Sequence, residues 1–71
     1  MSLEGIVTLL VGRCPDLAFW TDGHWVVANG GTEFKKGRCG DLSGGDSVKV
    51  NGRLRSNGVV DADQIELKKQ R

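Results

Sequence analysis

The sequence predicts a small all-β domain, and three observations lead to this class. The chain has 71 residues, the length of one domain. It contains 11 glycines and a single proline, which suits short strands joined by tight turns better than packed helices. Its apolar residues form short runs, several of which alternate with polar residues at the period of a half-buried strand.

The first strand is expected at residues 6–11, an aliphatic and β-branched run with a glycine on each side. We interpret residues 1–3 as cloning residues that precede the domain. The domain itself is expected to cover residues 4–69, which leaves residues 70–71 as a polar tail.

The second and third strands form the clearest local signal. Residues 17–21 and 24–28 flank an Asp-Gly pair at positions 22 and 23, which is typical of a two-residue hairpin with a primed turn. Such a turn sets the register of the hairpin, so Trp20 is expected opposite Trp25.

A long connection over residues 29–45 follows, where we expect loop, a single helical turn capped by Asp41, and Phe34 as an apolar plug. The fourth strand alternates cleanly over residues 46–55, and Gly52 inside it predicts a bend.

The last strand begins after a second hairpin turn at Asn57-Gly58 and continues to about residue 67. Its apolar alternation shifts phase at Asp63-Gln64, which predicts a β-bulge. Five strands, with the long connection after the third, follow the order of a small five-stranded OB-like barrel of the Greek-key type. Closure into a barrel also removes the exposed edges of an open sheet.

Bulk charge excludes few functions. The formal net charge of +1 lacks the basic excess of a dedicated duplex-DNA binder. The chain has no apolar run long enough to cross a membrane, so no membrane insertion is expected. It also begins without the basic and apolar regions of a signal peptide.

The two tryptophans are the strongest functional indication. Phe19 and Val26 make the better core, so Trp20 and Trp25 are expected to face outward together with Val27. An outward aromatic pair on these strands is typical of a ligand platform or a protein contact. Two other interpretations stay open: the pair only staples the hairpin, or the faces are inverted and the tryptophans belong to the core.

Arg53 and Arg55 are the remaining candidate binding residues. Together with Lys49 they line the outer face of the fourth strand, where they could follow a phosphate backbone. The alternative is a merely solvated strand face. Since the fourth strand does not adjoin the second and third in this order, the arginines are not required to join the tryptophans.

The two cysteines are candidates for a disulfide. Cys14 follows the first strand and Cys39 follows the third, and in an up-down-up run these two loops lie at the same end. The alternative is a pair of unpaired, buried thiols.

Catalysis, cofactors and metals are not expected. The single histidine, His24, has no acid or nucleophile placed to form a triad with it. Without a Cys-x-x-Cys motif and with one histidine, a metal site is not predicted. The domain is therefore not expected to be an enzyme.

The stretch from Gly45 onward resembles a bacterial OB-like family of unknown function that is common in exported and cell-envelope proteins. The resemblance rests on the run Gly45-Asp46-x-Val48-x-Val50-x-Gly52. It continues upstream and downstream in order, through residues Gly5, Val7, Cys14-Pro15, Phe19, Thr32, Phe34, Cys39, Gly58, Val60, Ala62 and Ile65. The resemblance implies the fold and an export context, but no activity.

Together these observations predict a non-catalytic binding or structural module of the bacterial envelope or exterior. Protein or glycan is the expected partner, and self-association through Trp20 and Trp25 is a further expectation. The alternative is a single-stranded nucleic-acid-binding domain, which free thiols and a continuous basic groove beside the tryptophans would favour. The alternative location is the cytoplasm. A purely structural repeat unit inside a longer protein is a third interpretation.

Overall fold

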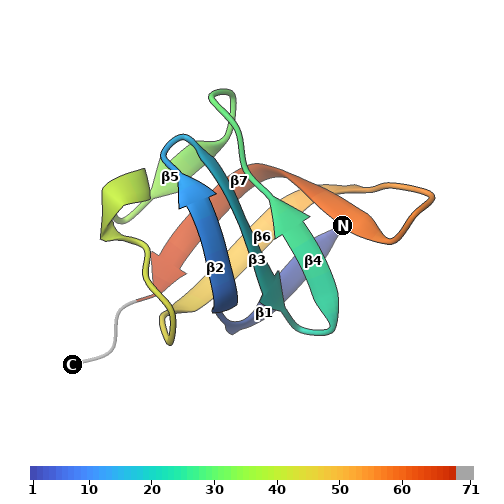
Figure 1. Ribbon diagram of the computed structural model, residues 1–71, viewed down its shortest axis with the longest axis horizontal. Helices are drawn as coiled ribbons and strands as arrows, with labels where there is room; N and C mark the ends of the chain where they lie inside the picture. The colour runs from blue at the N-terminus through green and yellow to red at the C-terminus, as the bar shows by residue number, and fades with distance from the viewer. Residues whose placement is uncertain (69–71) are drawn as a thin grey trace.

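The computed structural model describes residues 1–68, and within them the chain is all-β, as predicted (Figure 1). The elements in chain order are β1 (Ser2–Ile6), β2 (Thr8–Arg13), β3 (Asp16–Thr21), β4 (His24–Val27), β5 (Glu33–Lys35), the short 3-10 turn η1 (Cys39–Asp41), β6 (Ser47–Leu54) and β7 (Val59–Lys68). Among these residues, no helix is long and apolar enough to cross a membrane.

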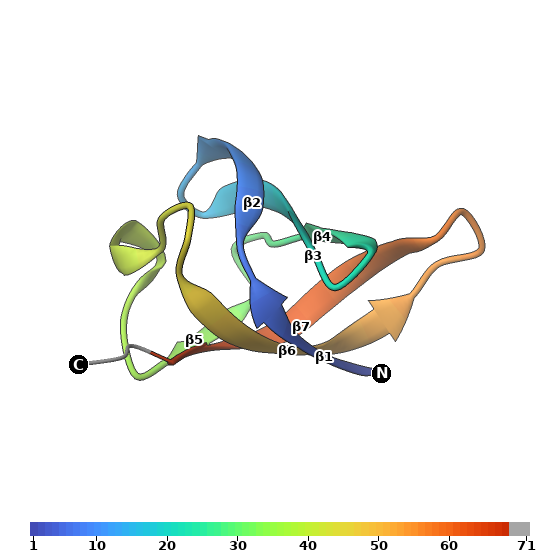
Figure 2. The ribbon, with the colours of Figure 1, turned by 90° about the horizontal axis from the view of Figure 1, so that it is seen from below.

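The strands form one seven-stranded sheet with the order β1-β6-β7-β4-β3-β2, and β5 adds to β7. Pairing is antiparallel except between β7 and its neighbours β4 and β5, which run parallel to it. The expected closure into a barrel is not observed, since within residues 1–68 the end strands β1 and β2 of the hydrogen-bonded path do not pair with each other. The sheet folds over on itself, so that β2, β3 and β4 form one layer above β1, β6 and β7 (Figure 2).

The expected count of five strands is wrong in two places. The expected strand at residues 6–11 is divided at Val7 into β1 and β2, because the segment leaves β6 there and joins β3. At this division the amide of Val7 donates to the carbonyl of Asp46 at 2.8 Å, and its carbonyl accepts from the amide of Gly45 at 2.8 Å. The other addition is β5, a short strand within the connection that was expected to be loop.

The first hairpin follows the prediction. Asp22 and Gly23 have φ angles of 50° and 76°, both in the left-handed region that a primed turn requires. Trp20 pairs with Trp25 and Phe19 with Val26. The local chemistry of two turn residues therefore sets the register of this pair of strands.

The β6–β7 hairpin extends beyond the rest of the molecule (Figure 1) and contains the predicted bulge. Asn51 pairs with Gln64 and Gly52 with Ala62, so Asp63 is an extra residue on β7. A Cβ at Gly52 would lie 2.9 Å from the carbonyl carbon of Asp61 and 3.0 Å from the Cα of Ala62. Glycine is therefore required here by the close approach of the two backbones.

The core lies between the two layers and is largely apolar, with Thr21 as a fully buried polar side chain. Its fully buried side chains include Phe19 and Val26 from one layer, and Val50, Val60 and Ile65 from the other. The domain begins earlier than expected, because Ser2 and Leu3 belong to β1 and Leu3 is only 5% exposed. The expected polar tail at residues 70–71 lies outside the described residues.

The connection between β4 and β6 covers one end of the core. Phe34 is half-buried and packs against the core, as expected of a plug, but it does so from β5. The helical turn ends at Asp41 instead of starting there. The carboxylate of Asp41 accepts a hydrogen bond from the amide of Arg38 at 2.9 Å, so Asp41 stabilises the turn from its third residue.

The same substitution is expected to have opposite effects on stability at two buried threonines. The hydroxyl of Thr32 accepts from the amide of Asn29 at 3.0 Å and donates to the carbonyl of Ala62 at 2.7 Å. Among residues 1–68, the buried hydroxyl of Thr21 has no hydrogen-bond partner. Thr32→Val should lower the free energy of unfolding by about 1–3 kcal/mol, since it leaves polar groups unpaired. Thr21→Val should leave it unchanged or raise it by about 1 kcal/mol.

Urea denaturation of the two variants and the parent chain measures the difference. Because the two substitutions are chemically identical, each serves as the control of the other. A loss of stability in Thr21→Val as large as that in Thr32→Val would contradict the assignment of an unpaired hydroxyl.

Candidate binding face

The tryptophan pair lies on the outer side of the β2–β3–β4 layer, which is the layer nearest the viewer in Figure 1. Trp20 is 42% exposed and Trp25 is partly exposed, while the alternating Phe19 and Val26 are fully buried. The ring centroids are 6.5 Å apart and the rings are tilted by 41°. This orientation is the one expected from the sequence, and the inverted arrangement is excluded.

Most side chains around the two rings are aliphatic, and Thr8 is the polar exception beside Trp20. Across the strands, Trp20 stands between Thr8 and Trp25, and the next row places Ala18 between Val11 and Val27. We call the outer apolar residues of these strands the tryptophan face: Leu9, Val11, Ala18, Trp20, Trp25 and Val27. Leu9 and Val11 are 70% and 52% exposed, so the tryptophan face extends to the edge of the sheet.

Leu9 and Val11 were not predicted as binding residues. The sequence predicted only a strand over residues 6–11, and the register between β2 and β3 shifts between Thr8 and Val11. Leu9 is the extra residue of this bulge and has a φ angle of 53°, whereas Leu10 packs against the core. No pattern in the apolar run itself marks the position where the phase changes.

Leu9 is in an unfavourable conformation. A left-handed φ costs an ordinary L-residue about 1–2 kcal/mol, and glycine is the usual residue at such a bulge. Burial within the chain offsets little of this cost, because Leu9 is 70% exposed. A strained, bulky and exposed apolar residue makes Leu9 a candidate contact residue.

The predicted arginines border this face across one intervening strand. Asp61 of β7 pairs with Val27 on one side and with Arg53 on the other. Asp61 also accepts hydrogen bonds from the guanidinium of Arg55. These hydrogen bonds and the negative charge of Asp61 raise the pKa of Arg55 above its ordinary value. All five predicted binding residues thus lie on one continuous outer surface.

The charge at this border is only partly available to a partner. Arg55 is neutralised by Asp61, while Arg53 is exposed and forms no ion pair within residues 1–68. The lysines of the β5 region, at positions 35 and 36, lie near Glu33 and Glu66 at 3.9 and 3.5 Å. The described residues therefore form no continuous basic groove beside the tryptophans.

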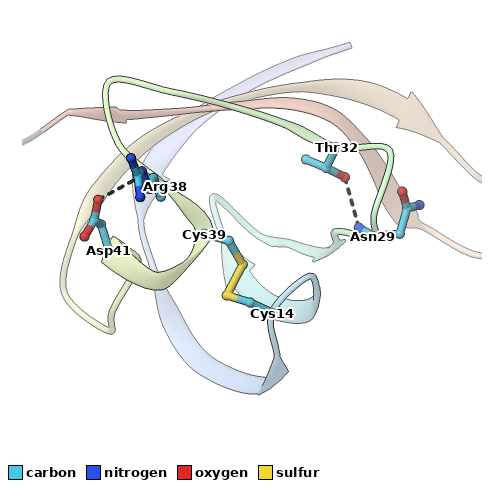
Figure 3. Close-up of a disulfide and its surroundings, with 6 residues drawn as sticks. All are labelled: Cys14, Asn29, Thr32, Arg38, Cys39 and Asp41. Carbon is cyan, nitrogen blue, oxygen red and sulfur yellow. Dashed lines mark hydrogen bonds between the residues drawn. A yellow bond between two sulfur atoms is a disulfide. The ribbon is translucent and has the colours of Figure 1, made fainter.

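The cysteines form the predicted disulfide, with the Cα atoms of Cys14 and Cys39 5.9 Å apart (Figure 3). The bridge ties η1 to the turn between β2 and β3, so it fixes the long connection against the layer that carries the tryptophan face. Free cysteines are absent from the described part of the chain.

Other surfaces of the described residues have fewer groups available to bind a ligand. A cavity of about 380 Å³ is lined by residues that include Ile6, Asp41, Ser43, Asp46 and Lys68, and by none of the tryptophan face. The carboxylate of Asp46 already accepts a hydrogen bond there from the amide of Ser43 at 3.0 Å. Among residues 1–68, no group of three or more His, Cys, Asp or Glu side chains is placed to hold a metal ion.

Comparisons with known proteins give one match. A family model described as a domain of unknown function (DUF5666) matches residues 4–66. No curated protein and no solved structure matches the chain.

Proposed function

The chain belongs to the DUF5666 family of domains of unknown function, and from this premise we propose that it is a non-catalytic module that binds another protein through the tryptophan face. The observation that carries the proposal is the continuous, exposed apolar surface around Trp20 and Trp25. A folded domain of this size rarely exposes such a patch unless it is a contact surface.

The surroundings of the rings favour protein over the other partners. Glycan platforms need several hydrogen-bonding groups beside the aromatic rings. The cross-strand neighbours outside the pair are Thr8 and Val59, and the hydroxyl of Thr8 already donates to the carbonyl of Trp20 at 2.9 Å. A protein surface supplies complementary apolar side chains and places its polar groups at the rim, where Arg53 and Asp61 lie.

A single-stranded nucleic-acid binder is the second candidate, and the exposed Arg53 beside the face favours it. The pairing of Arg55 with Asp61 weighs against it, because that pair removes one of the two charges that would follow a phosphate backbone.

We place the module in the bacterial envelope or exterior. Support comes from the disulfide, since such bonds persist in oxidising compartments. Alkylation of the natural protein without prior reduction tests this placement. Resistance of both cysteines to alkylation is expected, and uptake of two alkyl groups would favour the cytoplasm.

We also propose that the fold is a variant of the OB type. The strand order supports this, because β1 and β2, at the two ends of the path, are consecutive segments joined only by Val7. The parallel pairing of β4 with β7 and the connection between β4 and β6 also suit that type. In this arrangement the tryptophan face is the surface on which OB domains bind their ligands.

A photo-reactive residue at Val27 tests the proposed contact in an envelope extract of the source bacterium. Gly40 is a matched control position away from the face, because nothing lies within 4 Å of a Cβ placed there. Cross-linking to a defined protein from Val27, and none from Gly40, is the expected result. Equal cross-linking from both positions would remove the basis for a specific face.

Tryptophan fluorescence separates the alternatives. An oligothymidylate and a set of cell-wall oligosaccharides are titrated into the chain, and neither is expected to change the emission of Trp20 and Trp25. Quenching by the oligonucleotide that weakens with salt would instead support the nucleic-acid candidate. Saturable quenching by a glycan would overturn the choice of protein as the partner.

A further inference from the structure

We propose that the tryptophan face binds a second copy of this chain, so that two copies pack face to face about a two-fold axis. The axis would run along the strands, between β3 and β4. This inference rests on the proposed function, because it names the partner of the same face.

The strand order makes the face self-complementary. In the sequence β2-β3-β4-β7, an axis between β3 and β4 exchanges these two strands and also exchanges β2 with β7. Since Trp20 and Trp25 are directly opposed in register, the axis stacks Trp20 of one copy over Trp25 of the other. Ala18 and Val27 are opposed in the same way, which sets a small side chain against a larger one.

The exchange of β2 with β7 gives Leu9 a role. It brings the β2 bulge over the β7 strand of the second copy near Val59, which pairs with Trp25 at the border of the face. The exposed side chain of Leu9 would then be buried in the dimer. Burial there compensates for its left-handed backbone, which the single chain leaves uncompensated.

Charges at the two sides of the face are complementary under the same axis. Val11 of β2 and Asp61 of β7 share one row through Ala18 and Val27, so two residues further along each strand stand Arg13 and Asp63, both exposed. The exchange of these strands places Arg13 of one copy toward Asp63 of the other, and it does so twice because the axis is two-fold.

The available area suits a dimer. A stable interface buries about 800 Å² on each partner, about a fifth of the 4382 Å² that this chain exposes. One outer face of a two-layer domain can supply this area. Addition of a strand at the edge of β2 is a poorer route, because Leu9 and Gly12 both have left-handed φ angles that interrupt its hydrogen-bonding edge.

Sedimentation equilibrium of the complete chain, from about 1 to 500 µM, measures the association. A reversible dimer is expected for the parent chain. Leu9→Gly should weaken the dimer at least about tenfold, while its urea midpoint stays equal to or above that of the parent, since glycine relieves the bulge. This separates a loss of contact from a loss of folding.

A charge-reversal pair tests the axis itself. Arg13→Glu and Asp63→Lys should each weaken the dimer, because each sets like charges together twice. An equimolar mixture of the two variants should associate again, since both contacts then join opposite charges. Lys36→Glu, off the face, is the control and should leave the dissociation constant unchanged.

A chain that stays monomeric at 500 µM would overturn the inference, and so would a dimer that none of the face variants weakens. If Val27 still cross-links to another protein in the extract, the proposed function stands without the dimer. If Val27 gives neither a dimer nor another product, the proposed function fails as well.

Discussion

Removal of the Cys14–Cys39 disulfide is expected to lower the free energy of unfolding by about 3.5 kcal/mol. The two cysteines are 25 residues apart in the sequence, and a cross-link over a loop of this length removes about that much chain entropy from the unfolded state. A core in a chain of 71 residues leaves a net stability of only a few kcal/mol. The reduced domain is therefore expected to be largely unfolded at 37 °C.

The measurement compares urea denaturation of the oxidised chain, the chain kept in reductant, and the Cys14→Ser/Cys39→Ser double variant. If the double variant is already unfolded in buffer, a titration with trimethylamine N-oxide measures its refolding instead. The reduced chain serves as the control for the substitutions themselves. Equal midpoints for the oxidised and reduced chains would show that packing of η1 alone holds the long connection in place.

The second large effect is expected at Gly52. Gly52→Ala should lower the free energy of unfolding by about 3 kcal/mol, because its Cβ would clash with the carbonyl oxygen of Asp61 on the facing strand. The neighbouring atoms are backbone and cannot turn aside as the end of a flexible side chain can. The β6 and β7 strands would have to separate at the pair that follows the bulge.

Urea denaturation measures this loss, with Gly44→Ala as the matched control. Nothing lies within 4 Å of a Cβ placed at Gly44, which lies in the loop before β6, so this substitution should change stability by less than about 1 kcal/mol. Two equal, small effects would mean that β6 and β7 are farther apart in solution than the structure places them.

The same two features support the candidate binding face. The disulfide holds the long connection to the β2–β3 turn, and the close approach at Gly52 fixes β6 against β7. Through β7, that approach also sets where Arg53 and Asp61 lie beside Val27. A measured loss of stability at either site should therefore be accompanied by weaker binding through the face.

Several parts of this protein could be predicted from the sequence because short-range chemistry decides them. Asp22-Gly23 requires left-handed φ angles, and that turn alone sets Trp20 against Trp25. The shift in apolar alternation at Asp63-Gln64 predicted the bulge correctly, since alternation along a strand shows which residues lie on each of its two faces. The disulfide followed from the order of strands, which puts the two cysteine loops at one end.

Only the tertiary structure decided which side of the run at residues 6–11 is buried. A run of consecutive apolar residues does not alternate with polar ones, so it does not show which side chains face the core. The division at Val7 and the bulge at Leu9 arise where the chain changes its pairing partner from β6 to β3. The parallel pairing of β5 and the pairing of Arg55 with Asp61 likewise depend on residues distant in the sequence or across a strand. The sequence by itself determined the class, the turns and the tryptophan pair, because these depend on neighbours in the chain. The extent of the tryptophan face depended on which strands meet, and that is settled by packing of the whole core.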